Sequence, residues 1–139
     1  MNKKIIVSVL LLTGLIATNV AAKSFVSEVS INGLETKTKL NNNGKKVTTE
    51  AKTKEHVVCS KFSDKNIPKS SYTITQSLKK RTSSSGNMYR MSGIYKEYSC
   101  NNGMIEKKFS QQFLIPANYF PHDDYYVVKG TKINILIKK

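Results

Sequence analysis

Alternation of large and small or charged side chains is the feature that most constrains the fold of this chain. A period of two places successive side chains on opposite faces of a β-strand. The larger residues of the three clearest runs are Tyr72, Ile74, Gln76 and Leu78, then Ile105, Phe109, Phe113 and Ile115, then Ile133, Ile135 and Ile137. Each run predicts a strand with one buried and one solvated face, which is typical of antiparallel sheets.

Turn residues divide the chain into about eight such strands. Asn43-Gly44 and Asn102-Gly103 are predicted to form hairpin turns, because Asn-Gly adopts the positive φ angles that tight hairpins need. Ser83–Gly86 and Lys129-Gly130 are predicted to make two further connections. The expected strands, in a meander-like order, are Phe25–Ile31, Leu34–Leu40, Lys46–Thr53, Tyr72–Lys80, Met88–Ser99, Met104–Ile115, Tyr125–Val128 and Lys132–Lys138.

The pattern therefore predicts an all-β fold, either a small sandwich or a small barrel, with a single domain spanning residues 23–139. No stretch after residue 22 shows the 3.6-residue apolar period of an amphipathic helix. The proline-containing segments 61–70 and 116–121 are expected to be loops.

The first 22 residues have the composition of a signal peptide. Lys3 and Lys4 precede the apolar run Ile5–Ile16, and the small residues of Val20-Ala21-Ala22 follow at the expected cleavage site. The apolar run is shorter than the ~20 residues that a transmembrane helix needs. We therefore expect cleavage after Ala22 and export to the periplasm or the medium, and we do not expect an integral membrane protein.

Two cysteines, Cys59 and Cys100, are expected to form one disulfide, because thiols oxidise outside the cytoplasm. The bond would fasten the third predicted strand to the fifth. Two free buried thiols are the alternative.

A strongly basic balance points to an anionic partner. The chain carries 23 Lys and Arg against 9 Asp and Glu, a net charge of +14. This excess favours an anionic glycan, a lipid or an acidic protein surface. Only Arg81 and Arg90 are arginines, which argues against sequence-specific nucleic-acid recognition, because base reading relies on Arg. The alternative is that lysines coat the strands and prevent edge-to-edge pairing.

Residues that could carry catalysis are sparse. The densest group, His122-Asp123-Asp124, is expected to be a solvated turn in a proline-bounded loop rather than a metal site. No nucleophile elbow, metal-ligand spacing or phosphate-binding glycine loop is present. We therefore expect no enzymatic activity, no metal and no cofactor.

Two groups of side chains are candidates for binding. The basic group, placed beside the predicted Ser83–Gly86 turn, is Lys79, Lys80, Arg81 and Arg90. The aromatic group, around the loop at 116–124, is Tyr119, Phe120, Tyr125 and Tyr126. Basic side chains attract anions, and tyrosine has a flat apolar body with a polar tip that suits glycans and protein interfaces.

These observations predict an exported, non-enzymatic binding module that recognises an anionic glycan, lipid or protein surface. A periplasmic inhibitor or immunity-type protein that plugs a toxin or enzyme is the first alternative. A structural subunit of a surface fibre is the second, since an exposed sheet edge can accept a strand from a neighbour.

Overall fold

The computed structural model describes residues 23–59, 67–82 and 86–139, so the predicted signal peptide lies outside the described residues. These residues form an all-β structure without a helix, and none of them builds a helical segment able to cross a membrane. The strands are β1 (Ser24–Ile31), β2 (Leu34–Asn41), β3 (Val47–Lys52), β4 (His56–Val57), β5 (Ile67–Pro68), β6 (Ser70–Lys80), β7 (Asn87–Ser99), β8 (Gly103–Ile115), β9 (His122–Val128) and β10 (Thr131–Lys138).

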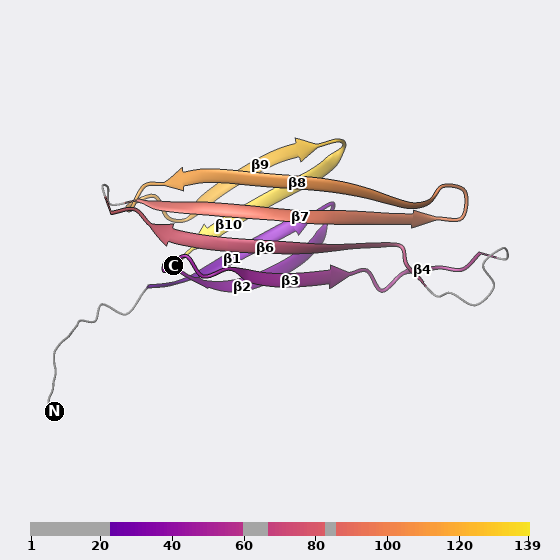
Figure 1. Cartoon of the computed structure of the whole chain (residues 1–139), viewed down its shortest axis with the longest axis horizontal. Helices are drawn as coiled ribbons and strands as arrows, with labels where there is room; N and C mark the ends of the chain where they lie inside the picture. Colours follow the sequence, from indigo (N-terminus) through magenta and orange to yellow (C-terminus); the bar gives the residue numbers. More distant parts are fainter. Residues whose placement is uncertain (1–22, 60–66, 83–85) are drawn as a thin grey trace, which may run out of the picture.

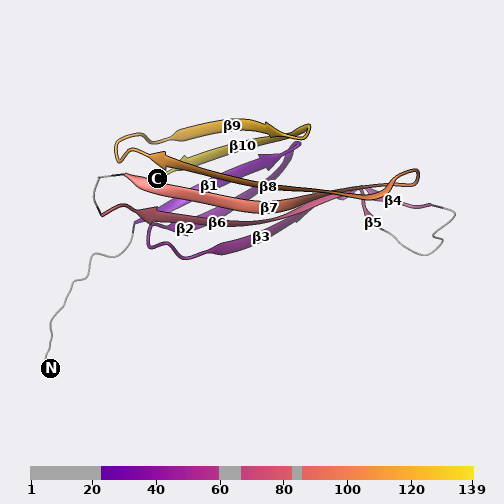
Figure 2. The ribbon, with the colours of Figure 1, turned by 45° about the horizontal axis from the view of Figure 1, so that its top comes forward.

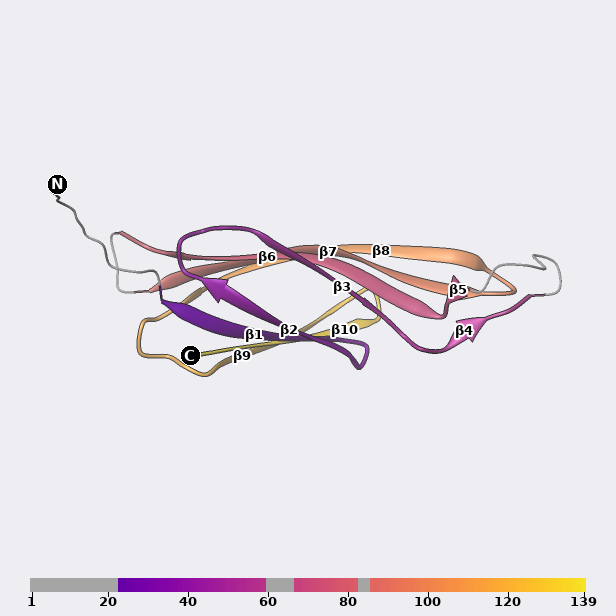
Figure 3. The same cartoon turned by 90° about the horizontal axis from the view of Figure 1, so that it is seen from below.

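Two four-stranded antiparallel sheets pack face to face (Figures 1 and 3). The β1 sheet has the order β2-β1-β10-β9, and the β7 sheet has the order β3-β6-β7-β8. The short strands β4 and β5 pair only with each other among the described strands. Of the two architectures expected, the described strands form the sandwich.

The order of strands in the β1 sheet differs from the expected meander. The first and last strands, β1 and β10, pair antiparallel from Val26↔Lys138 to Ile31↔Ile133. The β7 sheet is therefore inserted between β2 and β9 along the chain. A meander requires each turn to join neighbouring strands, whereas β1 and β10, in which every second residue is buried, pair at the centre of the sheet with β2 and β9 on their outer edges.

Alternation along the strands produces the core as predicted. Inward residues of both sheets meet in one apolar cluster: Phe25, Val29, Ile31, Leu40, Ile133, Ile135 and Ile137 from the β1 sheet, and Tyr72, Ile74, Leu78, Tyr89, Met91, Tyr95, Phe109 and Ile115 from the β7 sheet. Ile105 departs from the expectation, with 40% of its surface exposed. β7 and β8 have 13 residues each and reach past β9 and β10 (Figures 1 and 2), so the β1 sheet does not cover this end.

Three polar residues of the described chain are fully buried, Ser27, Gln76 and Thr131, and the first two belong to a hydrogen-bonded cluster between the sheets. The Oε1 atom of Gln76, in β6, accepts hydrogen bonds from Ser27 Oγ of β1 and, at 2.7 Å, from Tyr89 OH of β7. Burial raises the pKa of Tyr89 and that of Tyr126 above the ordinary value of 10, so both phenols remain protonated even at alkaline pH. The cluster joins the two sheets through hydrogen bonds as well as apolar contacts.

Asn43-Gly44 does not form the predicted hairpin. Gly44 has the expected positive φ of 84°, but the segment carries the chain from the β1 sheet to the β7 sheet. Asn42 lies between the two: its N–H donates to Lys23 O at 3.2 Å, and its carbonyl accepts from Lys80 N at 3.0 Å. The local turn chemistry was predicted correctly, and the partner of the following strand was not.

The other turn predictions agree with the pairing of the strands. Asn102-Gly103 joins β7 to β8, and Lys129-Gly130 joins β9 to β10, with positive φ at Gly103, Lys129 and Gly130. β6 and β7 form the hairpin that Ser83–Gly86 was expected to connect, although residues 83–85 lie outside the described residues.

The predicted disulfide between Cys59 and Cys100 is present, with Cα atoms 5.5 Å apart. Its surroundings differ from the expectation, because Cys59 follows β4 rather than the strand that begins at Lys46. β4 pairs with β5, which lies in the segment 61–70 expected to be a loop. The bond therefore holds the β4–β5 pair to the projecting end of β7.

Gly93, in the centre of β7, has no room for a side chain. A Cβ atom there would lie 2.6 Å from Thr73 O, 2.7 Å from Ile74 Cγ2 and 2.9 Å from Phe109 Cζ. Gly93→Ala is expected to lower the free energy of unfolding by about 1–3 kcal/mol, since a backbone oxygen cannot move aside. Urea denaturation measures this, with Ser92→Ala, exposed on the outer face, as the control. An unchanged midpoint for Gly93→Ala would contradict this close packing.

The ion pair between Glu28 and Lys138 gives the fold a pH dependence. Lys138 Nζ lies 2.6 Å from Glu28 Oε2, and this hydrogen bond lowers the pKa of Glu28 below its ordinary value of 4.5. Glu28 therefore binds a proton more tightly in the unfolded chain than in the folded one. The contribution of the ion pair to the free energy of unfolding is complete above about pH 4.5 and is lost as the pH falls through the pKa of Glu28 in the folded state. Glu28→Gln should flatten this acid limb in urea titrations, whereas Glu50→Gln should leave it as in the wild type.

The disulfide is expected to stabilise the projecting end more than the core. Replacing Cys59 and Cys100 by Ala should cost up to about 4 kcal/mol for the 41-residue separation. Because neither residue belongs to the core cluster, hydrogen exchange in the double variant should rise first in β4 and β5. An equal loss of protection in β10 would contradict this assignment.

Candidate functional site

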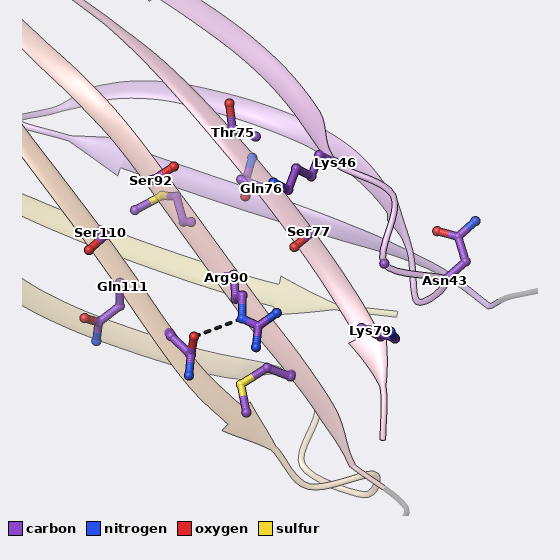
Figure 4. Close-up of a pocket in the computed structure, with 14 residues that line it drawn as sticks. Asn43, Lys46, Thr75, Gln76, Ser77, Lys79, Arg90, Ser92, Ser110 and Gln111 are labelled. Carbon is purple, nitrogen blue, oxygen red and sulfur yellow. Dashed lines mark hydrogen bonds between the residues drawn. The ribbon is translucent and has the colours of Figure 1, made fainter. Parts of the chain in front are cut away.

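The outer face of the β7 sheet carries a shallow, open depression of about 540 Å³ (Figure 4). We call it the basic groove, because three cationic side chains line it together with hydroxyl and amide groups. Its outward-facing polar residues are Lys46, Thr75, Ser77, Lys79, Arg90, Ser92, Ser110 and Gln112. These positions alternate with core residues, so the period of two that buries one face also builds the groove on the other.

A row of hydroxyl groups crosses the floor of the groove. Thr75 of β6 lies opposite Ser92 of β7, which lies opposite Ser110 of β8. Thr48 of β3 extends the row at its rim, with its Oγ1 2.9 Å from that of Thr75. Antiparallel strands are about 4.8 Å apart, so the row presents hydroxyls at roughly that interval.

Arg90 is held in the neighbouring row. It pairs across the strands with Ser77 on one side and Gln112 on the other. Its Nε donates to Gln112 Oε1 at 2.9 Å, as the dashed line in Figure 4 shows. The two terminal guanidinium nitrogens have no hydrogen-bond partner within the described chain, which leaves them available to an anion.

Lys79 and Lys46 complete the positive charge of the groove. The Lys79 side chain lies over Gly44, where a Cβ atom would be only 3.3 Å from Lys79 Cδ. Within residues 23–59, 67–82 and 86–139, Lys46, Lys79 and Arg90 form no ion pair, and no acidic residue lines the groove. The groove therefore carries uncompensated positive charge.

The structure places the predicted basic group partly in this groove. Lys79 and Arg90 line it together, whereas Lys80 and Arg81, both exposed, lie at the end of β6 outside it. Lys46 belongs to the groove although it was not predicted. Only the pairing of β3 with β6 places it there, and no local pattern around Lys46 indicates this pairing.

The predicted aromatic group does not join the basic group. Phe120 packs on Phe25, with ring centroids 5.0 Å apart, and Tyr126 is half-buried against the core. Tyr119 is exposed and contacts the His122 ring edge-on at 5.0 Å. Tyr125 faces outward from β9, on the opposite side of the sandwich from the groove.

Tyr125 lines a second depression, of about 460 Å³, on the outer face of the β1 sheet. We call it the Tyr125 depression. Its lining residues are Ser30, Asn32, Gly33, Tyr125, Lys132 and Asn134. Tyr125 thus lies on one outer face and the groove residues Lys79 and Arg90 on the other, which no spacing along the sequence indicates.

The acidic group at 122–124 is not the solvated turn that was expected. β9 begins at His122, so all three residues are strand residues. His122 is half-buried and stacks on Phe113 at 4.8 Å, and Asp124 accepts a hydrogen bond from Gln111 at 3.3 Å. These contacts join β9 to β8 across the open side of the sandwich. No group of three or more His, Cys, Asp or Glu residues suited to a metal ion occurs in the described part of the chain.

Comparison with known proteins finds no family model, no curated protein and no solved structure that matches this chain. The function is therefore inferred from the two outer faces and their residues.

Proposed function

We propose that the chain is an exported, non-enzymatic binding module and that its basic groove binds an anionic glycan. The observation that supports this most is the grouping of Lys46, Lys79 and Arg90 on one outer face without an acidic neighbour in the lining. The predicted signal peptide supports export, because a leader of this composition directs a chain out of the cytoplasm.

Charge supports an anionic ligand. Arg90, fixed at Nε by Gln112, can donate from its terminal nitrogens to a sulfate or carboxylate in a paired, planar arrangement. Lys46, which precedes β3, and Lys79 of β6 add positive charges at one side of the groove. These three side chains would contact the acidic substituents of the glycan.

The lining, which is polar apart from Gly44, Met88 and Met91, supports a glycan over a lipid or a protein surface. The exposed large apolar residues of the described chain, which are Val58, Met104, Ile105, Leu114, Tyr119, Tyr125 and Val127, all lie outside the groove lining. A lipid surface would engage apolar anchors, and a protein hot spot would use buried aromatic or aliphatic contacts. A sugar offers hydroxyl groups that pair with hydroxyl and amide side chains such as Thr75, Ser92 and Gln112.

The groove has dimensions suited to a short stretch of chain. The strands that line it are β6, β7 and β8, whose two intervals of about 4.8 Å span roughly 10 Å, or about two sugar residues. The groove lining in the described chain contains no His, Cys, Asp or Glu that could act as a general acid, base or nucleophile. We therefore assign recognition, not turnover, to this face.

Binding to a heparin hexasaccharide tests the proposal. Arg90→Gln combined with Lys79→Gln is expected to weaken binding by at least about tenfold, since two charge-assisted contacts are lost. The salt dependence should also become shallower, because fewer cations release counter-ions. Isothermal titration at low and high salt measures both effects.

The control is Lys39→Gln combined with Lys54→Gln, which removes the same charge from exposed positions outside the groove. This variant should bind nearly as the wild type does. Equal losses in the two double variants would show diffuse attraction to net charge and would contradict a groove. Binding to phosphatidylglycerol vesicles without binding to the hexasaccharide would overturn the glycan assignment.

A further inference from the structure

We propose that the Tyr125 depression is a second binding site, which takes one pyranose ring stacked on Tyr125. This site goes beyond the groove, because it lies on the outer face of the other sheet and uses different residues. It does not require the glycan to be anionic.

The pairing of three strands places an aromatic ring, an amide and a hydroxyl in one row. Tyr125 of β9 lies opposite Asn134 of β10, and Asn134 lies opposite Ser30 of β1. Antiparallel neighbours are about 4.8 Å apart, so Asn134 lies roughly the width of one sugar ring from Tyr125, and Ser30 about twice as far. All three positions lie within regular strands, which hold their side chains more precisely than loops do.

The wall of the depression is fixed by the turn between β1 and β2. Asn32 N donates to Lys132 O at 2.9 Å, and Lys132 N donates to Asn32 Oδ1 at 2.8 Å. Asn32 has a positive φ of 50° and Gly33 one of 86°, the conformation of a tight hairpin. The two hydrogen bonds attach this turn to β10 and close one side of the depression.

Three of the polar side chains that line the depression have no partner within the described chain. The Asn134 amide, the Ser30 hydroxyl and the Lys132 ammonium make no hydrogen bond or ion pair to another described residue. The amide alone offers two donors and an acceptor, which can pair with neighbouring sugar hydroxyls. These groups can therefore bind a ligand without first breaking an internal contact.

Tyr125 provides the apolar surface that a sugar ring needs. Its side chain is 53% exposed, and its neighbours in the lining are polar or small. One face of a pyranose carries mainly C–H groups, which pack on an aromatic ring, while its hydroxyls remain at the edge. A single aromatic surface bordered by amide and hydroxyl groups fits this distribution, whereas an apolar peptide side chain would need an apolar pocket.

The two sites lie on opposite outer faces of the sandwich. The inward residues between them form the common core, so a ligand on one outer face does not block the other. Where the proposed function of the groove also holds, one domain carries an anionic chain on one face and a sugar residue on the other.

Nuclear magnetic resonance titration of the mature protein tests the second site. The probes are the methyl pyranosides of glucose, galactose, mannose and N-acetylglucosamine, each raised to high millimolar concentration. At least one is expected to shift the backbone amides of Ser30, Tyr125 and Asn134 in a saturable manner. Tyr125→Ala should weaken that binding by about tenfold, whereas Tyr125→Phe, which keeps the ring, should bind nearly as the wild type does.

The matched control is Tyr119→Ala, because Tyr119 is 54% exposed and lies outside the depression. It should leave the sugar-induced shifts unchanged. Absence of saturable shifts at the depression with all four probes would overturn the proposal, as would equal losses in the Tyr125 and Tyr119 alanine variants. The proposal for the basic groove is tested separately. If the groove does not bind an anionic glycan, a heparin hexasaccharide will leave the amides of Ser92 and Ser110 unshifted.

Discussion

The contact between the two sheets determines which residues face outward, and the buried amide of Gln76 lies at the centre of that contact. Ser27 of one sheet and Tyr89 of the other both donate to its Oε1 atom. Its Nε2 atom has no partner in the described chain, although such a buried group costs free energy. Because of these directed bonds, β6 fits the β1 sheet in one register, and a shift by one residue would bring its outward hydroxyls into the core.

Both proposed sites depend on this register. Ser77 and Thr75 flank Gln76 in β6 and face outward because Gln76 faces inward. Likewise, Asn134 faces outward between Ile133 and Ile135, which are fully buried. The outward-facing side chains of a sandwich do not pack in the core between the sheets, so polar residues at these positions can bind a ligand without weakening the core.

The unequal lengths of the two sheets create a separate structural problem. The β1 sheet does not extend beneath the projecting end of β7 and β8, where Ile105 is 40% exposed. The disulfide and the β4–β5 pair lie at this end. A covalent bond thus stabilises a region that the β1 sheet does not cover, which is a common role of disulfides in small domains.

The sequence by itself determined the local features: the alternation in β6 and β10, the hairpin at Asn102-Gly103, the disulfide, and the basic character of the chain. The first two depend on the conformational preferences of residues close together in the chain. The disulfide follows because two cysteines allow only one intramolecular pairing, and the basic character follows from composition. Long-range pairing was decided only by the tertiary structure, because it depends on which apolar faces pack best together. That packing brought β1 beside β10, made Asn43-Gly44 a crossing between sheets, added Lys46 to Lys79 and Arg90, and placed Tyr125 on the opposite face.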